Sequence, residues 1–211
     1  MQSLPKLTEL DLVGIGTGTY ANCTSWLPSP NNLTTLSLSR CRLTDADIAG
    51  ICRSTKHLVA LDLAGNRISS ECLVHIRTLE TLRRLDISAT TIFDLETLCV
   101  FQGGCAGKLH TFCASKNGLQ DRAIHMITTS MVNLTSLTID RANFSFQGFS
   151  GLFRLKKLRF LDMSYNVAAI EWNAALAGME TFGVLERFKI YGCGGSLDIF
   201  RKLMPHVVQW F

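Results

Sequence analysis

Long apolar runs, cysteine-pair motifs and catalytic signatures are all missing from this sequence of 211 residues. No uninterrupted apolar stretch approaches the roughly 18 residues that a transmembrane helix needs, so no membrane-spanning segment is predicted. The first residues, Met1 to Leu7, lack the charged region and apolar run of a secretory signal and already fit the pattern that fills the rest of the chain. We therefore expect neither a membrane segment nor a signal peptide.

Signatures of catalysis are absent as well. The sequence has no GxSxG elbow, no HExxH helix and no P-loop, and its five histidines share no motif. Spaced glycines follow Val13, but a phosphate-binding turn needs a helix directly after it, and Pro28 and Pro30 come there instead. A connection between structural units is the favoured interpretation of that segment. We predict that the chain is not an enzyme and binds no cofactor.

The eight cysteines lack the short CxxC spacing of structural zinc sites. Their tightest cluster, for which no metal is expected, consists of Cys99, Cys105, His110 and Cys113. Cys52, Cys72 and Cys99 fall on helix faces predicted to be buried, where a free cysteine behaves as a small hydrophobic residue. Cysteines that stay reduced favour a reducing compartment, so the sequence predicts an intracellular location, with the cytoplasm preferred.

What the sequence does contain is a repeated leucine pattern. Residues 58–68 read LVALDLAGNRI, which has the spacing LxxLxLxxNxL. Copies begin at Leu7, Leu33, Leu58, Leu82, Leu109, Leu134, Leu158 and Leu185. The steps between them are 24 to 27 residues, a regularity that chance leucines do not produce. The pattern resembles the leucine-rich repeat family, in particular its intracellular ribonuclease-inhibitor-like and cysteine-containing branches.

This resemblance implies an α/β fold. The expected architecture is a leucine-rich repeat solenoid, curved like a horseshoe, with parallel β-strands on the concave face and helices on the convex face. Eight repeats would form a single domain over residues 1–211. Within a repeat, alternation places leucines such as Leu61 and Leu63 on the core side of a short strand. Asn66 then ends the strand by hydrogen-bonding the backbone of a tight turn, and Cys41 and Cys193 hold the same position in their repeats.

Helical spacing follows several of the strands. Thr44 to Asp47 combine capping oxygens with negative charge, as a helix start requires, and Ile48, Ile51 and Cys52 follow on one face. Further helices are predicted within residues 69–76, 94–101, 121–127, 168–179 and 196–204. Gly148 and Gly151 lower the helix propensity of residues 145–155, which makes a short 3₁₀ segment the alternative there.

The outward residues of the predicted strands form parallel columns on the concave face. Small residues dominate the middle of this surface, whereas aromatic and charged residues gather on two adjacent strands near the C-terminus. We predict that a partner-binding patch is formed by Phe160, Asp162, Tyr165, Arg187, Lys189 and Tyr191. The alternative is that Asp162 pairs with Lys189 across the strands and that the aromatic residues cover the end of the core. A weaker candidate patch contains Arg84 and Asp86.

Two classes of function follow from these features. The first is a protein-interaction scaffold or adaptor, a subunit of a larger intracellular complex, that binds a protein partner through the concave face or the ends. Val207, Val208, Trp210 and Phe211 either cap the core or insert into that partner. The second is a structural subunit of a ribonucleoprotein particle, supported by a net charge of +4 and by the basic residues Arg154, Lys156, Lys157, Arg159, Arg201 and Lys202.

Overall fold

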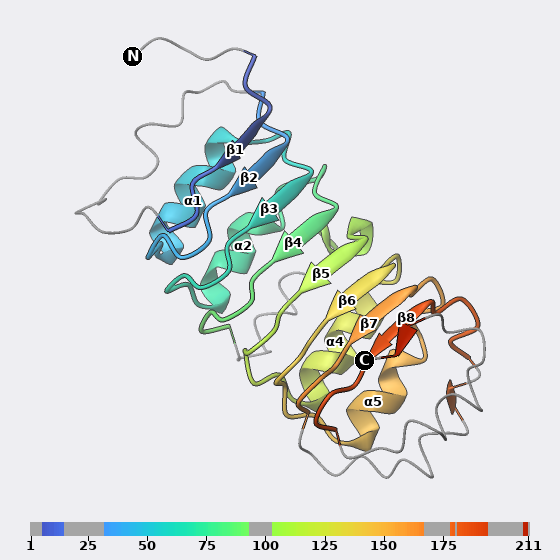
Figure 1. The fold of residues 1–211 in the computed structure, drawn as a ribbon. Coiled ribbons are helices and arrows are strands. Elements are labelled where there is room, and N and C mark those ends of the chain that lie inside the picture. Colours follow the sequence, from blue (N-terminus) through green and yellow to red (C-terminus); the bar gives the residue numbers. More distant parts are fainter. Residues whose placement is uncertain are drawn as a thin grey trace. The chain divides into compact units, whose positions relative to one another are not determined.

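The computed structural model describes residues 6–14, 32–92, 103–166, 178–179, 181–193 and 209–210. The chain divides into two compact units, Met1–Leu109 and His110–Phe211, which are described separately below (Figure 1). The single domain expected over residues 1–211 stays a prediction. Within the described residues, no helix is both long and apolar enough to cross a membrane.

The first unit is built on four parallel strands. They are β1 (Glu9–Asp11), β2 (Thr35–Ser37), β3 (Ala60–Asp62) and β4 (Arg84–Asp86). Each strand begins two residues after the first leucine of a repeat, and neighbours pair in sequence order without a register shift. Leu36, Leu61 and Leu85 occupy the central strand position and are buried, as the alternation predicts. The predicted columns of outward residues are therefore confirmed in this unit.

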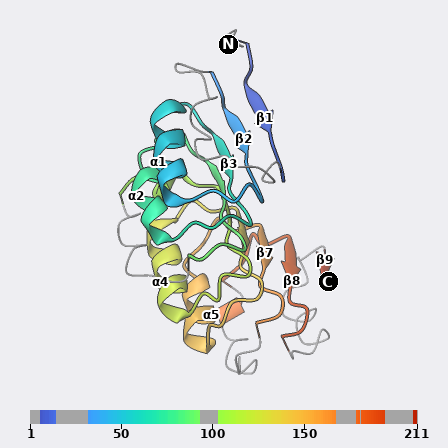
Figure 2. The same ribbon diagram turned by 90° about the vertical axis from the view of Figure 1, so that its left-hand side faces the viewer.

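Short helices cover one side of these strands (Figure 2). They are α1 (Asp45–Ser54), η2 (Ser70–Cys72), α2 (Leu73–Ile76) and η3 (Ala106–Lys108). Thr44 caps α1 in a capping box with Asp47, and Ile48, Ile51 and Cys52 are buried as predicted. The helix predicted within residues 94–101 lies outside the described residues.

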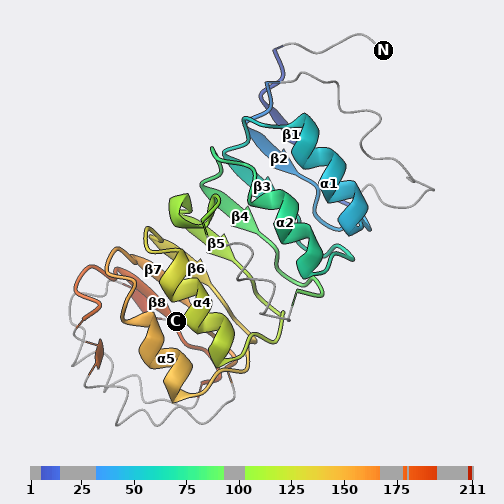
Figure 3. The same cartoon turned by 180° about the vertical axis from the view of Figure 1, so that it is seen from behind.

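The second unit repeats this plan. Its strands are β5 (Thr111–Cys113), β6 (Ser136–Thr138), β7 (Phe160–Asp162), β8 (Arg187–Lys189) and β9 (Gln209–Trp210). They are parallel and pair in sequence order. Seen from behind, α4 (Asp121–Ser130) and α5 (Phe146–Leu152) lie side by side over these strands (Figure 3). Strand β9 was not predicted from the sequence, because two residues carry no usable alternation.

Aromatic side chains fill much of the core of the second unit. Phe112 and Phe188 stand where other repeats have leucine and are buried, as are Phe144, Phe149 and Phe182. The rings of Phe149 and Phe182 each meet Phe153 edge to face at 5.2 Å. Apolar substitution at the leucine positions has therefore preserved the buried core.

The 3₁₀ alternative for residues 145–155 is wrong, because residues Phe146–Leu152 form an α-helix. Gly148 is needed there: a Cβ at this position would lie 2.5 Å from Asp121 Oδ1 and 2.9 Å from Phe144 Cβ. Met179 is buried as predicted. Most of the predicted helix 168–179, all of helix 196–204, Arg201 and Lys202, and tail residues Val207, Val208 and Phe211 lie outside the described residues.

Candidate functional site

Every repeat turns after its strand through a residue with left-handed backbone conformation. This residue always stands seven positions after the first leucine, and φ there lies between +52° and +74°. The eight residues are Gly14, Arg40, Gly65, Ala89, Lys116, Arg141, Tyr165 and Gly192. Glycine adopts this conformation without steric cost, whereas the other five do not. The turn therefore imposes one geometry on all repeats and aims these side chains outward from equivalent positions.

Of the seven described residues that follow this turn, six are buried, and an asparagine there binds the backbone of two repeats. Asn66 Nδ2 donates to the carbonyls of Leu38 and Leu63 at 2.8 Å each. Its Oδ1 accepts from the amides of Cys41 and Leu43 at 3.0 Å each. One buried amide side chain thus satisfies four backbone groups that would otherwise be left without partners. This confirms the turn-forming role predicted for Asn66.

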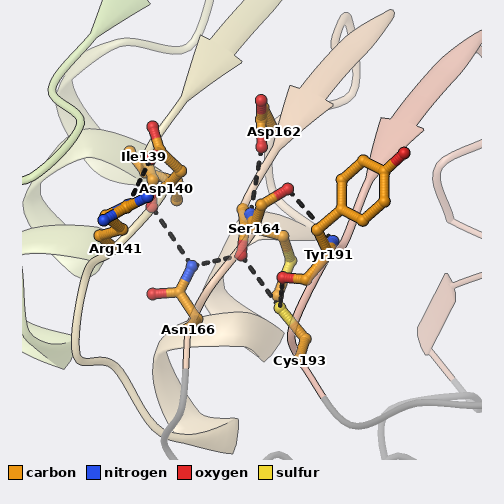
Figure 4. A network of polar contacts seen from close by, with 9 residues as sticks. Ile139, Asp140, Arg141, Asp162, Ser164, Asn166, Tyr191 and Cys193 are labelled. Carbon is orange, nitrogen blue, oxygen red and sulfur yellow. Dashed lines mark hydrogen bonds and ion pairs between the residues drawn. The ribbon is translucent and has the colours of Figure 1, made fainter. Parts of the chain in front are cut away.

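In two repeats a cysteine takes the place of this asparagine and donates a hydrogen bond to a backbone carbonyl of the preceding repeat. The thiol of Cys41 donates to Leu12 O at 3.0 Å, and that of Cys193 donates to Met163 O at 3.2 Å. Asn166 donates through Nδ2 to Ile139 O and Met163 O, but within the described part of the chain its buried Oδ1 has no hydrogen-bond partner (Figure 4). A thiol can replace the donor side of asparagine but does not supply its strong acceptor.

Aspartate at the end of a strand stabilises the turn by accepting a hydrogen bond from a turn amide. Asp11, Asp62, Asp86 and Asp162 each accept a hydrogen bond from the amide two residues further on, at 2.8 to 3.2 Å. Burial raises the pKa of the Asp86 carboxyl, and the nearby Asp62 adds to this rise, while hydrogen bonds from Ser88 oppose it. Two of the predicted site residues, Asp86 and Asp162, therefore have a local structural role.

On the strand face of the second unit, two cations lie over one aromatic ring. The guanidinium carbon of Arg187 is 5.1 Å from the centroid of the Phe160 ring, and Lys189 Nζ is 5.7 Å from it. Phe160 and Arg187 are register partners in β7 and β8, as are Asp162 and Lys189. The sequence prediction that these four residues share two adjacent strands is confirmed.

A second aromatic pair stands at the turns beside these strands. The guanidinium of Arg141 lies 4.9 Å from the centroid of the Tyr165 ring. On the Gly192 side the ring packs against backbone, since a Cβ there would come within 2.8 Å of Tyr165 Cδ1. Tyr165 nevertheless keeps 48% of its surface exposed, and Tyr191 keeps 51%. We refer to Phe160, Tyr165, Arg187, Lys189, Tyr191 and Arg141 together as the strand-face patch.

Known proteins share this geometry. The family model described as Leucine Rich repeat matches residues 29–52 and 55–74. Among solved structures, an internalin from Listeria monocytogenes superposes with a TM-score of 0.57 at 17% identity, over 74% of this chain and 41% of the internalin chain. No curated protein sequence matches. Two segments of this chain thus match the leucine-rich repeat family, and the chain has the leucine-rich repeat fold. Leucine-rich repeat domains generally mediate protein–protein interaction.

Of the eight predicted site residues, five belong to the strand-face patch. Asp162 lies beside them on β7, but its carboxylate accepts a hydrogen bond from the Ser164 amide in the turn. Arg84 and Asp86 lie on β4, in the first unit. Arg141 was missed by sequence reasoning. It stands seven positions after Leu134, as Tyr165 stands seven positions after Leu158, so the shared position within the repeat was the signal that would have found it.

The cysteines of this repeat protein are mostly part of its core. Burial raises the pKa of the Cys52 and Cys105 thiols to about 12, and it also raises the pKa of Cys72 and Cys193. A thiol held protonated is a poor nucleophile and a poor metal ligand. Within the described residues, no group of three or more His, Cys, Asp or Glu is arranged to hold a metal ion. Cys99 of the predicted cluster lies outside those residues.

Proposed function

We propose that this leucine-rich repeat protein is a non-catalytic scaffold or adaptor, a subunit of a larger intracellular complex, that holds a protein partner on the strand-face patch. The observation that carries the proposal is the set of cations fixed over aromatic rings: Arg187 and Lys189 over Phe160, and Arg141 over Tyr165. Tyrosine and arginine dominate interface hot spots. Side chains already held in one position lose less conformational entropy when a partner binds.

The chemistry of the patch defines the partner. Three cations and three aromatic residues lie on this face; Arg141 also forms an ion pair with Asp140 at 3.7 Å, and the carboxylate of Asp162 is engaged by the Ser164 amide. A complementary surface offers carboxylates to Arg187, Lys189 and Arg141 and apolar or planar groups to Phe160 and the exposed tyrosines. We therefore expect a protein partner with an acidic segment that also carries at least one large apolar side chain.

The contacts of the basic residues favour a protein partner over RNA. Phosphate recognition needs clustered positive potential. Of the basic residues that supported the RNA alternative, Lys157 donates to Asn133 Oδ1 at 2.6 Å, and Arg159 forms an ion pair with Glu186. Arg187 and Lys189 are stacked on Phe160. Because these basic side chains are bound to polar, acidic and aromatic partners, they do not form a continuous positively charged surface for phosphates. RNA binding is therefore the weaker alternative.

The test is affinity capture of the tagged protein from native lysate at physiological and high salt. The wild type is compared with a variant carrying Phe160→Ala, Arg187→Ala and Tyr191→Ala. We expect a protein partner that the wild type retains at both salt concentrations and the variant loses. Affinity of the purified partner should fall by about 100-fold or more in the variant, because hot-spot residues each contribute roughly 2 kcal/mol or more.

A matched control removes similar groups from the helix face: Arg53→Ala with Val74→Ala, both exposed positions of the first unit. This control variant should keep the partner, and both variants should keep the circular dichroism spectrum of the wild type. If the patch variant retains the same partner as the wild type, the strand-face patch is not the binding site. If only salt-sensitive RNA is recovered, the ribonucleoprotein alternative replaces the proposal.

A further inference from the structure

Helices α4 and α5 lie side by side on the helix face of the second unit (Figure 3). Residues of these two helices and Arg154 line a polar cavity of about 560 Å³. Its lining includes the charged and titratable side chains of Asp121, Arg122, His125 and Arg154. Gln147 and Ser150 contribute an amide and a hydroxyl from α5, and Gly151 leaves the space between the helices open. Apolar side chains that would mark a simple packing gap do not line this cavity within the described residues.

The one carboxylate in this lining is already engaged by protein donors. Asp121 Oδ1 accepts from the amides of Ser145 at 2.6 Å and Gly148 at 3.1 Å, while Oδ2 accepts from Ser145 Oγ at 2.6 Å. These donors belong to the N-terminus of α5, whose positive dipole end compensates the negative charge. The acidic group is therefore used to hold α5 in place and is not positioned to neutralise the cations further along the cavity.

The side chains of His125 and Arg154, which line the cavity, contact each other. Arg154 Nη1 lies 3.4 Å from His125 Nδ1, where the guanidinium donates to the ring nitrogen; the other guanidinium N–H groups and His125 Nε2 are then the groups that can donate to an anion. Among the described residues, no carboxylate lies within ion-pair distance of Arg154. An oxyanion in the cavity beside this pair would accept from the guanidinium N–H groups of Arg154 that point away from His125 and from His125 Nε2, with the Gln147 amide nearby, while the Ser150 hydroxyl already donates to Gln147 O at 2.9 Å.

We propose that this cavity binds a phosphate group carried on a serine or threonine side chain of a partner protein. A phosphate presents about two negative charges and three strong acceptor oxygens. Those oxygens match the donors of His125 on α4, Gln147 on α5 and Arg154 just after α5, and arginine guanidinium groups favour planar, bidentate phosphate recognition. A carboxylate carries one charge and two oxygens, so it would use fewer of these donors. The cavity volume also leaves room for backbone on either side of the modified residue.

The cavity is independent of the strand-face patch. Helices α4 and α5 lie on one side of the strands (Figure 2), and the buried Leu161 and Phe188 point to the core, so alternation directs Phe160 and Arg187 to the other side. It therefore adds a second, modification-dependent contact to the proposed scaffold. A patch variant should bind phosphate as the wild type does, and a cavity variant should keep partners that use the patch alone. Failure of one proposal can thus be told apart from failure of the other.

The experiment measures binding of short alanine peptides with a central phosphoserine, serine or glutamate, by titration calorimetry at constant ionic strength. Proteins compared are the wild type, Arg154→Gln, His125→Gln and the control Arg53→Gln, which removes one charge from an exposed helix position of the first unit. We expect saturable binding of the phosphoserine peptide to the wild type. Arg154→Gln and His125→Gln should each weaken it by about tenfold or more, as loss of a charge-assisted hydrogen bond predicts.

The control variant should bind the phosphoserine peptide as the wild type does, and the serine peptide should not bind. Three results would overturn the proposal. The first is no saturable binding of the phosphoserine peptide, and the second is an equal loss in Arg53→Gln. The third is inorganic phosphate or the glutamate peptide binding as tightly as the phosphopeptide, which would make the cavity a general anion site. Both cavity substitutions are at exposed positions, so their melting temperatures should match the wild type.

Discussion

At the scale of single residues, each turn of this fold has one residue in the left-handed conformation, and a buried side chain follows it in most of the described repeats. Where that side chain is asparagine, it connects the carbonyls of successive repeats. Asparagine, cysteine, threonine and alanine all occur at this position, in Asn66, Cys41, Thr90 and Ala142. Because these side chains satisfy different numbers of backbone groups, the same position should contribute unequally to stability from repeat to repeat.

Asn66→Ala should lower the free energy of unfolding more than Asn166→Ala. The first substitution leaves four buried backbone groups without their partner, whereas Asn166 serves two carbonyls. We expect a loss of about 3 kcal/mol or more for Asn66→Ala and roughly 1–2 kcal/mol less for Asn166→Ala. Urea unfolding followed by circular dichroism measures both. Equal losses, or a larger one at Asn166, would show that the hydrogen bonds of the side-chain oxygen do not set the difference.

Ala89→Gly should stabilise the protein. Ala89 has φ +52°, a conformation that costs a residue with Cβ about 1 kcal/mol and glycine almost nothing. The free energy of unfolding should therefore rise by roughly 0.5–1 kcal/mol, after the greater freedom of glycine in the unfolded chain is taken into account. Ala60→Gly in β3 is the control, since its backbone is extended and glycine should destabilise it. A stability loss at Ala89 would mean that the strain is relieved by contacts of the methyl group.

At the scale of elements, the helical segments of successive repeats are connected by one aspartate–serine contact. Asp45 at the start of α1 accepts from the amide and hydroxyl of Ser69, which caps η2. Asp121 at the start of α4 accepts from the same two groups of Ser145, which caps α5. The spacing is 24 residues in both cases. One helix start therefore positions the next, in each unit.

The two glycines of α5 give a matched test of this contact. Gly148→Ala should destabilise the protein by about 1–3 kcal/mol, because the new Cβ would meet Asp121 Oδ1 at 2.5 Å and disturb its hydrogen bonds. Gly151→Ala should stabilise it by roughly 0.5–1 kcal/mol, since the nearest side-chain atom, Thr128 Oγ1, is 3.8 Å away and alanine favours a helix. Thermal unfolding of the two variants decides the matter. Equal effects of the same sign would contradict the proposed contact.

The leucine spacing sufficed to locate all eight strands at the repeat positions, because burial of the core side enforces the same alternation in every repeat. The spacing left a short 3₁₀ segment open as the alternative to a helix at residues 145–155, because the need for Gly148 comes from a contact with Asp121 in the preceding repeat. It also did not show that Asp162 is engaged by a turn amide or that Arg141 stacks on Tyr165. Such features depend on contacts between repeats, which local propensity does not encode.

At the scale of the whole molecule, the second unit carries both surfaces proposed for recognition. The strand-face patch combines aromatic rings with cations, and the cavity between α4 and α5 combines guanidinium and imidazole groups. Basic residues outnumber acidic ones among the described residues of this unit. A partner with an acidic, apolar segment and a phosphorylated site would engage both faces, and binding through two contacts would exceed either affinity alone.

The central claim is that a protein partner sits on the strand-face patch, and site-specific photocrosslinking tests it most directly. A photoreactive phenylalanine analogue replaces Phe160, Tyr165 or Tyr191 in turn, and Val74 or Val132 as exposed control positions elsewhere. After irradiation in native lysate, we predict that the same protein is crosslinked from the three patch positions and from neither control. Crosslinks to that protein from the control positions alone would contradict the account and move the binding surface away from β7 and β8.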